Sequence, residues 1–129
     1  MFKKNKINWH CGYIFSREIN NSFIPQKVQN LVIRDYAQKN KLNLRLSATE
    51  YKARNSFLML KSLCKKNSSY SGIILYSIFM IDNFQNYEFF LKKFLKNKII
   101  LISALEEIEI KNYKDIIKLR RMFYINKKT

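Results

Sequence analysis

Glycine and proline are nearly absent from this sequence of 129 residues, which contains two glycines and one proline. A phosphate-binding loop needs several glycines to bring its backbone close to the ligand, so a glycine-rich nucleotide cradle is excluded. The same scarcity argues against long flexible linkers. Hydrophobic residues make up 47% of the chain, as in a packed globule with one core. We therefore expect a single domain over residues 11–125, preceded by a basic, flexible lead-in over residues 1–10.

Cysteine and histidine are equally scarce, which excludes several kinds of metal and redox chemistry. The two cysteines, Cys11 and Cys64, are far apart and form no CxxC pair, so neither a disulfide framework nor a zinc site is predicted. The single histidine, His10, lies in the expected lead-in, and a Ser-His-Asp triad is not expected. We predict no metal and no cofactor. Two cysteines with no expected disulfide fit a reducing compartment. The sequence also lacks a signal-peptide pattern and an apolar run long enough to span a bilayer. Together these features favour a cytoplasmic location.

Acidic residues are also few: nine Asp and Glu stand against 25 Lys and Arg, giving a formal net charge of +16. One interpretation is a polyanionic partner such as nucleic acid or an anionic membrane surface. The other is A/T-rich coding bias, because Lys, Asn and Ile are all over-used. The lysines are scattered through the expected helices and tails. We therefore favour bias, and nucleic acid is the less favoured partner.

The sequence does contain a regular alternation of short apolar runs and amphipathic stretches. The apolar runs predict strands over residues 11–16, 43–48, 72–79 and 98–105. The amphipathic stretches predict helices over residues 25–40, 56–66, 87–96 and about 112–124. Such alternation is typical of a parallel sheet with right-handed crossovers. The predicted fold is a three-layer α/β domain with a four-stranded, mostly parallel sheet flanked by helices. Strand 72–79, apolar on both faces, is expected to be central.

Each expected strand ends on or near a serine, and a glutamate follows three of these serines closely. The serines are Ser16, Ser47, Ser77 and Ser103, and the glutamates are Glu18, Glu50 and Glu106. Because parallel strands end at one edge, where open α/β sheets bind ligands, the sequence predicts a polar ligand site there. The candidate binding residues are Ser16, Arg17, Glu18, Gln26, Gln29, Ser47, Thr49, Glu50, Ser77 and Glu106.

The alternative for each of these residues is structural, because acidic and hydroxyl side chains after a strand also cap the next helix. Asn20 and Asn21 are interpreted as turn residues in the same way, and Asp82 and Asn83 as helix caps. Ser16 lacks an assignable activating base, so a binding or structural hydroxyl is favoured over a nucleophile. If the ligand interpretation holds, Ser16→Ala or Glu50→Ala abolishes binding and leaves thermal stability nearly unchanged.

Several segments resemble the bacterial sporadic carbohydrate cluster protein family. The segments are residues 12–18 (Gly-Tyr-Ile-Phe-Ser-Arg-Glu), 25–36 (beginning Pro-Gln-Lys-Val), 46–51 (Leu-Ser-Ala-Thr-Glu-Tyr) and 72–79 (Gly-Ile-Ile-Leu-Tyr-Ser-Ile-Phe). The resemblance covers about residues 11–110. It implies a protein of a surface-polysaccharide biosynthesis cluster with no settled reaction. A sugar derivative or other small polar metabolite is the implied ligand, and an enzyme of that synthesis is a further implied partner.

A more distant resemblance is to the catalytic domain of the serine recombinases, or resolvases. There too a Gly-Tyr strand ends in a serine, and a helix follows with a pattern like residues 35–37 (Asp-Tyr-Ala). The resemblance places Ser16 at the nucleophile position. The chain departs from the family where Ile14 or Phe15 replaces an arginine, and where residues 79–80 (Phe-Met) replace an Asp-Arg pair. Because those arginines stabilise a charged phosphoryl transition state, we expect the fold without the activity. The alternative function is then a nucleic-acid-binding module of resolvase ancestry.

Overall fold

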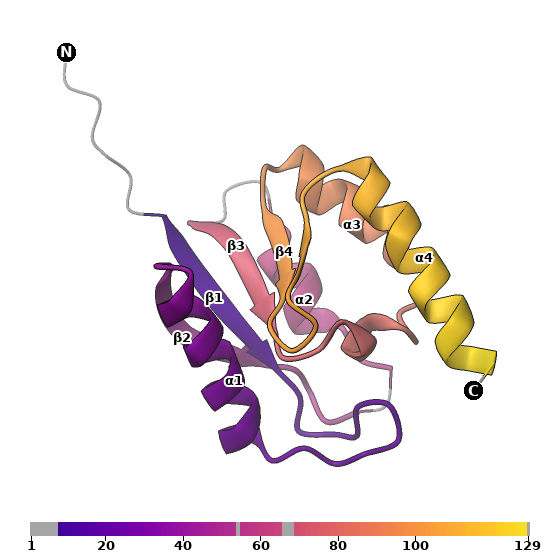
Figure 1. Ribbon diagram of the computed structural model, residues 1–129, viewed down its shortest axis with the longest axis horizontal. Helices are drawn as coiled ribbons and strands as arrows, with labels where there is room; N and C mark the ends of the chain where they lie inside the picture. The colour runs from indigo at the N-terminus through magenta and orange to yellow at the C-terminus, as the bar shows by residue number, and fades with distance from the viewer. Residues whose placement is uncertain (1–7, 54, 66–68, 129) are drawn as a thin grey trace.

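A five-stranded sheet organises the described residues, 8–53, 55–65 and 69–128, of this computed structural model (Figure 1). The strands are β1 (Trp9–Ile14), β2 (Asn43–Thr49), β3 (Tyr70–Leu75), β4 (Ile100–Ser103) and β5 (Ile108–Ile110). Their spatial order is β2-β1-β3-β4-β5. The first four strands run parallel, and β5 pairs antiparallel with β4. The predicted mostly parallel α/β fold is confirmed, with one strand more than the sequence predicted.

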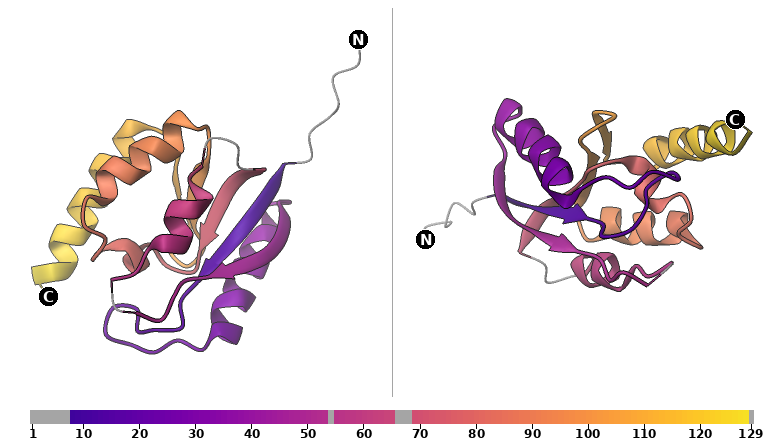
Figure 2. Two further views of the ribbon diagram at one scale, coloured as in Figure 1. Left: turned by 180° about the vertical axis from the view of Figure 1, so that it is seen from behind. Right: turned by 90° about the horizontal axis from the view of Figure 1, so that it is seen from below.

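Helices cover both faces of this sheet. They are α1 (Gln26–Lys39), α2 (Leu58–Leu63), α3 (Tyr87–Lys96) and α4 (Tyr113–Lys128), with a short 3₁₀ helix, η1 (Ile78–Ile81). α1 lies on one face and α2 and α3 lie on the other (Figure 2). α4 packs beside β5 and α3. The described elements therefore form the three layers that the sequence pattern predicts. No described helix combines the length and the apolar character that crossing a bilayer requires.

β3 is the central strand, as its continuous apolar run predicts. Ile73, Ile74 and Leu75 are fully buried, because helices cover both faces of the sheet at this point. The strand is shorter than predicted. After Leu75 the backbone leaves the sheet and enters η1, and the Ser77 hydroxyl accepts a hydrogen bond from the backbone N–H of Phe79 at 3.2 Å. This cap ends the strand before the apolar run itself ends.

Two further boundaries differ from the prediction. Trp9 and His10, assigned to the lead-in, already belong to β1, and His10 is only 6% exposed. Its ring fits because the neighbouring residue on β3 is Gly72, where a Cβ atom would lie 2.6 Å from the imidazole Cδ2. β5 was missed because its three residues are too few for alternation to be read. Residues 1–7 of the expected lead-in lie outside the described residues.

Asparagine and lysine occupy backbone positions where glycine is usual. Seven described non-glycine residues have positive φ, and four of them are asparagines. Asparagine tolerates this left-handed conformation better than most residues. At the end of α1, Lys41 adopts it with a φ of 55°. The next residue, Leu42, donates its N–H to the Ala37 carbonyl at 2.8 Å. This is the Schellman closure of a helix end, made without glycine.

Replacing Lys41 with glycine is therefore expected to stabilise the protein by about 0.5–1 kcal/mol, because relief of the left-handed strain outweighs the added freedom of the unfolded chain. Chemical denaturation measures the difference. Arg34→Gly, at an exposed site inside the same helix, is the control and should lose about 1 kcal/mol. A Lys41→Gly variant less stable than the wild type contradicts the prediction.

Candidate functional site

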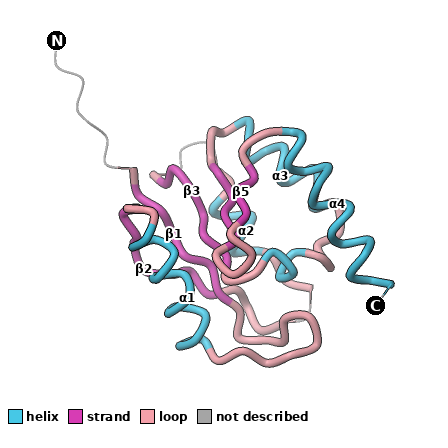
Figure 3. The backbone as a smooth tube through the Cα atoms, viewed as in Figure 1, coloured by secondary structure: helices cyan, strands magenta, loops and turns pink. Residues whose placement is uncertain are grey.

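A cleft of about 690 Å³ opens at the carboxyl edge of the sheet. It lies among the segments that follow β1, β2 and β3 and the C-terminal end of α4. Figure 3 shows the long loops after β1 and β2 running close together beyond the strand ends. The apolar part of the lining consists of Phe15, Phe57, Phe79 and Met80. This is the edge at which the sequence predicts a ligand site.

Asparagine is the commonest residue in the polar lining of this cleft. The five asparagines are Asn20, Asn21, Asn55, Asn83 and Asn126. Asn20, Asn21 and Asn55 have φ values of 52°, 66° and 63°, so their backbone conformation already favours asparagine. The side chain of Asn126 donates to the Asn20 side-chain oxygen at 3.1 Å, which joins the end of α4 to the loop after β1. Each amide offers both donors and an acceptor, which suits hydroxyl groups.

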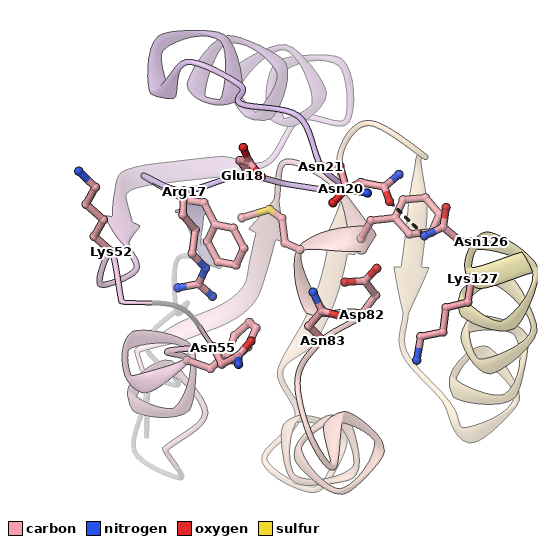
Figure 4. A pocket seen from close by; sticks show the side chains of 14 residues that line it. Arg17, Glu18, Asn20, Asn21, Lys52, Asn55, Asp82, Asn83, Asn126 and Lys127 are labelled. Carbon is pink, nitrogen blue, oxygen red and sulfur yellow. Dashed lines mark hydrogen bonds between the residues drawn. The ribbon is translucent and has the colours of Figure 1, made fainter. Parts of the chain in front are cut away.

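Charges of both signs lie among these amides. The cations are Arg17, Lys52 and Lys127, and the carboxylates are Glu18 and Asp82. Asp82 is half-buried, and burial raises the pKa of its carboxyl group, while Lys127 and the backbone N–H of Asn83 oppose that shift. Figure 4 shows Asp82 and Asn83 between Arg17 on one side and Lys127 on the other. The cleft is therefore a mixed polar site rather than a purely cationic one.

Arg17 is held by the loop that follows β2. Its guanidinium donates to the carbonyl oxygens of Tyr51 at 2.9 Å, Ala53 at 3.1 Å and Ser56 at 2.8 Å. The same group lies 4.0 Å from the centre of the Phe15 ring. Burial lowers the pKa of the guanidinium, although a nearby phenol and carboxylate oppose the shift. Arg17 thus joins two loops, and most of its hydrogen-bonding capacity is used within the protein.

Glu50 is a buried helix cap. It is 2% exposed, and its carboxylate accepts hydrogen bonds from the backbone N–H groups of Met59 at 3.1 Å and Leu60 at 3.2 Å. It also accepts from the Tyr51 N–H at 2.9 Å and the Tyr13 hydroxyl at 2.7 Å. Burial, together with this contact, raises the pKa of the Tyr13 phenol. In this structure Glu50 therefore caps the helix that follows β2, which was the structural alternative to ligand binding.

Glu106 has a similar structural role at the neighbouring strand ends. Its carboxylate accepts from the Ser77 hydroxyl at 2.8 Å, from the Ile78 N–H at 2.8 Å and from the Ser103 hydroxyl. The two serines follow β3 and end β4, respectively. Two of the strand-end serines therefore meet, as the parallel sheet predicts, but they meet on a glutamate of the same chain.

Gln29 and Ser47 point inward as well. Gln29 is fully buried, and its amide accepts from the Phe15 N–H and donates to the Phe15 carbonyl, both at 2.9 Å. The side chain thus continues the pairing of β1 beyond the end of the strand. Ser47 donates to the Asn30 side-chain oxygen at 2.7 Å, on the face covered by α1. Both residues hold α1 against the sheet.

Of the candidate binding residues, only Arg17 and Glu18 line the cleft. Ser16 is half-buried, Gln26 and Thr49 are exposed, and these three make no side-chain hydrogen bond within the described part of the chain. The prediction did not include the asparagines and Asp82: it interpreted Asn20 and Asn21 as turn residues, Asn55, Asp82 and Asn83 as helix caps, and Asn126 as part of the C-terminal tail. The signal that could have found them is the recurrence of asparagine after three successive strands. Among the described residues no cluster of His, Cys, Asp and Glu is placed to hold a metal ion.

The sheet order and the flanking helices define an α/β domain of the resolvase fold. The chain is similar to the N-terminal catalytic domain of TP901-1 integrase, with 20% identity and a TM-score of 0.55, over 90% of this chain and 93% of that one. It is also similar to a resolvase family site-specific recombinase from Streptococcus pneumoniae, with 13% identity and a TM-score of 0.60, over 91% of this chain and 87% of that one.

No protein-family model and no curated protein sequence matches the chain. At these identities, the likeness to solved structures establishes the fold alone. The predicted resolvase-like fold is confirmed. The resemblance to the sporadic carbohydrate cluster family has no support among these comparisons.

Proposed function

We propose that the protein is a ligand-binding domain on the resolvase fold, and that the carboxyl-edge cleft holds a small polyhydroxylated metabolite such as a sugar derivative. The observation that carries the proposal is the set of five asparagine amides around an apolar floor. Amide groups both donate to and accept from hydroxyls, and the Asp82 carboxylate adds a strong acceptor. The partly exposed ring of Phe79 suits the C–H face of a sugar ring.

The same residues support the absence of recombinase chemistry. The resolvase resemblance expects an Asp-Arg pair at positions 79 and 80. This chain has Phe79 and Met80 there, and both belong to the apolar lining of the cleft. Arg17, the cation next to Ser16 in sequence, donates to three carbonyl oxygens of the loop after β2. Stabilising a phosphoryl transition state requires cations directed at the transferred group. A setting in surface polysaccharide synthesis, with an enzyme of that synthesis as a partner, rests on the sequence resemblance alone.

The double variant Asp82→Asn with Asn83→Ala is expected to weaken ligand binding at least tenfold. A thermal-shift panel of free sugars, nucleotide sugars and sugar phosphates identifies the ligand class, and calorimetry then measures its affinity. Because the pKa of Asp82 is raised, its carboxylate becomes protonated at a higher pH than an ordinary aspartate. Binding should therefore weaken as the pH falls through that pKa.

The contribution of Asp82 to the stability of the fold changes with pH in the opposite direction to its contribution to binding. A carboxyl group whose pKa is raised on folding favours the folded state in its neutral form, so its contribution is lost as the pH rises through that pKa. Asp82→Asn should thus leave the protein at least as stable at neutral pH. Gln38→Ala, at an exposed site on α1, is the control for binding. A panel that produces no shift, or a double variant that binds like the wild type, removes the cleft as the ligand site.

The alternative function, nucleic-acid binding by a domain of resolvase ancestry, has support from a different surface. The charge of +16 leaves many lysines without a carboxylate partner. Several of these lysines come together in a groove on the face of the sheet opposite α1.

A further inference from the structure

A groove of about 710 Å³ lies between α2 and α3, away from the carboxyl-edge cleft. Five lysines line it, with Cys64, Phe90 and Asn97 as the other lining residues. The lysines are Lys61, Lys65, Lys93, Lys96 and Lys98. Figure 2 shows α2 and α3 as neighbours on this face. We call this surface the lysine groove.

The positive charge of the lysine groove is not balanced by acidic side chains. All nine acidic residues of the chain are described, and none of them lines the groove. The ion pairs among the described residues involve other cations, namely Lys39, Lys111 and Arg120. The negative ends of α2 and α3 offset part of the repulsion among the lysines. Five lysines that are separated along the sequence gather around this one hollow.

The floor of the lysine groove is held by a hydrogen bond between its two helices and contains an aromatic ring. The side chain of Asn97 donates to the Cys64 carbonyl at 2.6 Å, which ties the end of α3 to the end of α2. The half-buried ring of Phe90 has two ammonium groups over it, with Lys61 at 5.2 Å and Lys93 at 5.5 Å from its centre. An aromatic ring among cations is the arrangement on which single-stranded nucleic acids bind, with the bases on the ring and the phosphates on the cations.

We propose that the lysine groove binds single-stranded nucleic acid. The lysines hold successive phosphates of one strand, and a base contacts Phe90. A duplex would bring its phosphates to the same lysines but would present no free base to the apolar floor. The proposal is independent of the sugar-binding cleft, because the two sites share no lining residue.

The test compares two triple variants with the same loss of charge. Lys61→Gln, Lys93→Gln and Lys96→Gln change the groove, whereas Lys27→Gln, Lys41→Gln and Lys114→Gln change exposed lysines elsewhere. Fluorescence anisotropy with a labelled single strand of about 12 nucleotides, within the site sizes known for such grooves, measures affinity against salt. The groove variant is expected to bind at least tenfold more weakly at low salt. Its salt slope should fall by about 2, at roughly 0.7 for each lost phosphate contact. The control should stay within about threefold of the wild type.

Further ligands separate the single strand from other polyanions. An abasic strand of the same length should bind at least about fivefold more weakly than the strand with bases, because base stacking is lost. The duplex should also bind more weakly than the single strand. Equal loss in both triple variants, tighter binding of the duplex, or equal binding of the abasic strand would overturn the proposal. Binding to anionic phospholipid vesicles is measured for the same variants. A groove variant that still binds the single strand but no longer binds the vesicles would also overturn the proposal.

The cleft variant, Asp82→Asn with Asn83→Ala, provides the last control. It should bind the single strand as the wild type does, because it leaves the groove intact. The groove variant should in turn keep any sugar binding. Failure of one site is thereby distinguished from failure of the other. All three changed lysines of the groove are exposed, so each variant should stay within about 0.5 kcal/mol of the wild type in stability.

Discussion

Glu50→Ala is expected to lower the free energy of unfolding by about 3–5 kcal/mol, because it leaves several buried donors without an acceptor. The carboxylate accepts from the Met59 and Leu60 N–H groups at the start of α2 and from the Tyr13 hydroxyl in β1. Leu60 and Tyr13 are 2% and 0% exposed, so their donors are shielded from water. Urea denaturation followed by circular dichroism measures the loss, and the slope of the transition should not change.

Two other variants test the origin of this loss. Glu50→Gln keeps one acceptor oxygen and presents donors to the remaining N–H and hydroxyl groups, so it should lose about half as much as the alanine variant. Glu18→Ala removes an exposed carboxylate of the cleft and should stay within about 0.5 kcal/mol of the wild type. A Glu50→Ala protein of normal stability would restore Glu50 as a binding residue, as the sequence suggested. The structure predicts otherwise, because the carboxylate is already bonded within the fold.

Glu106→Ala should cost about 2–4 kcal/mol of stability, through one buried N–H and two hydroxyl groups that lose their acceptor. The N–H belongs to Ile78, which is 0% exposed, although Glu106 itself is partly exposed. The hydroxyls of Ser77 and Ser103 bring the ends of β3 and β4 to the same side chain. The loss of this contact should loosen the strand ends and η1 together.

A double-mutant cycle separates the contributions. Ser103→Ala should cost about 1 kcal/mol in the wild type and almost nothing beside Glu106→Ala, because the Ser103 hydroxyl acts on that carboxylate. Ser77→Ala should keep part of its cost in both backgrounds, because the Ser77 hydroxyl also accepts from the Phe79 N–H. Glu107→Gln, at the next and exposed position, serves as the control. Strict additivity of the three changes would show that the serines and the glutamate act separately.

Several elements of the fold follow from local pattern. α3 spans Tyr87–Lys96, as predicted, because its apolar residues recur at helical spacing and are buried against the sheet. β3 is central because a run that is apolar on both faces has no other place in a layered domain. β5, with three residues, and α2, reduced to Leu58–Leu63, are too short for periodicity to fix their bounds. The existence and the bounds of such short elements depend on their tertiary contacts.

The sequence predicted the edge of the sheet where the cleft lies but not most of the residues that line it. Parallel strands share one carboxyl edge, so the location followed from the order of strands and helices. The direction of each polar side chain did not follow. Glu50 meets Tyr13, 37 positions away, and Glu106 meets Ser77, 29 positions away. Asn126 reaches Asn20 from the opposite end of the chain.

By itself, then, the sequence determined the α/β alternation, the central strand and the edge where the strand ends gather. These depend on the apolar spacing of neighbouring residues, which is local. The tertiary structure decided which polar groups are satisfied within the fold and which remain open to a ligand. It also gathered lysines of α2 and α3, which look scattered along the chain, into one groove. Both outcomes depend on distant segments meeting, because burial removes water as a partner and leaves each polar group only the neighbours that the fold supplies.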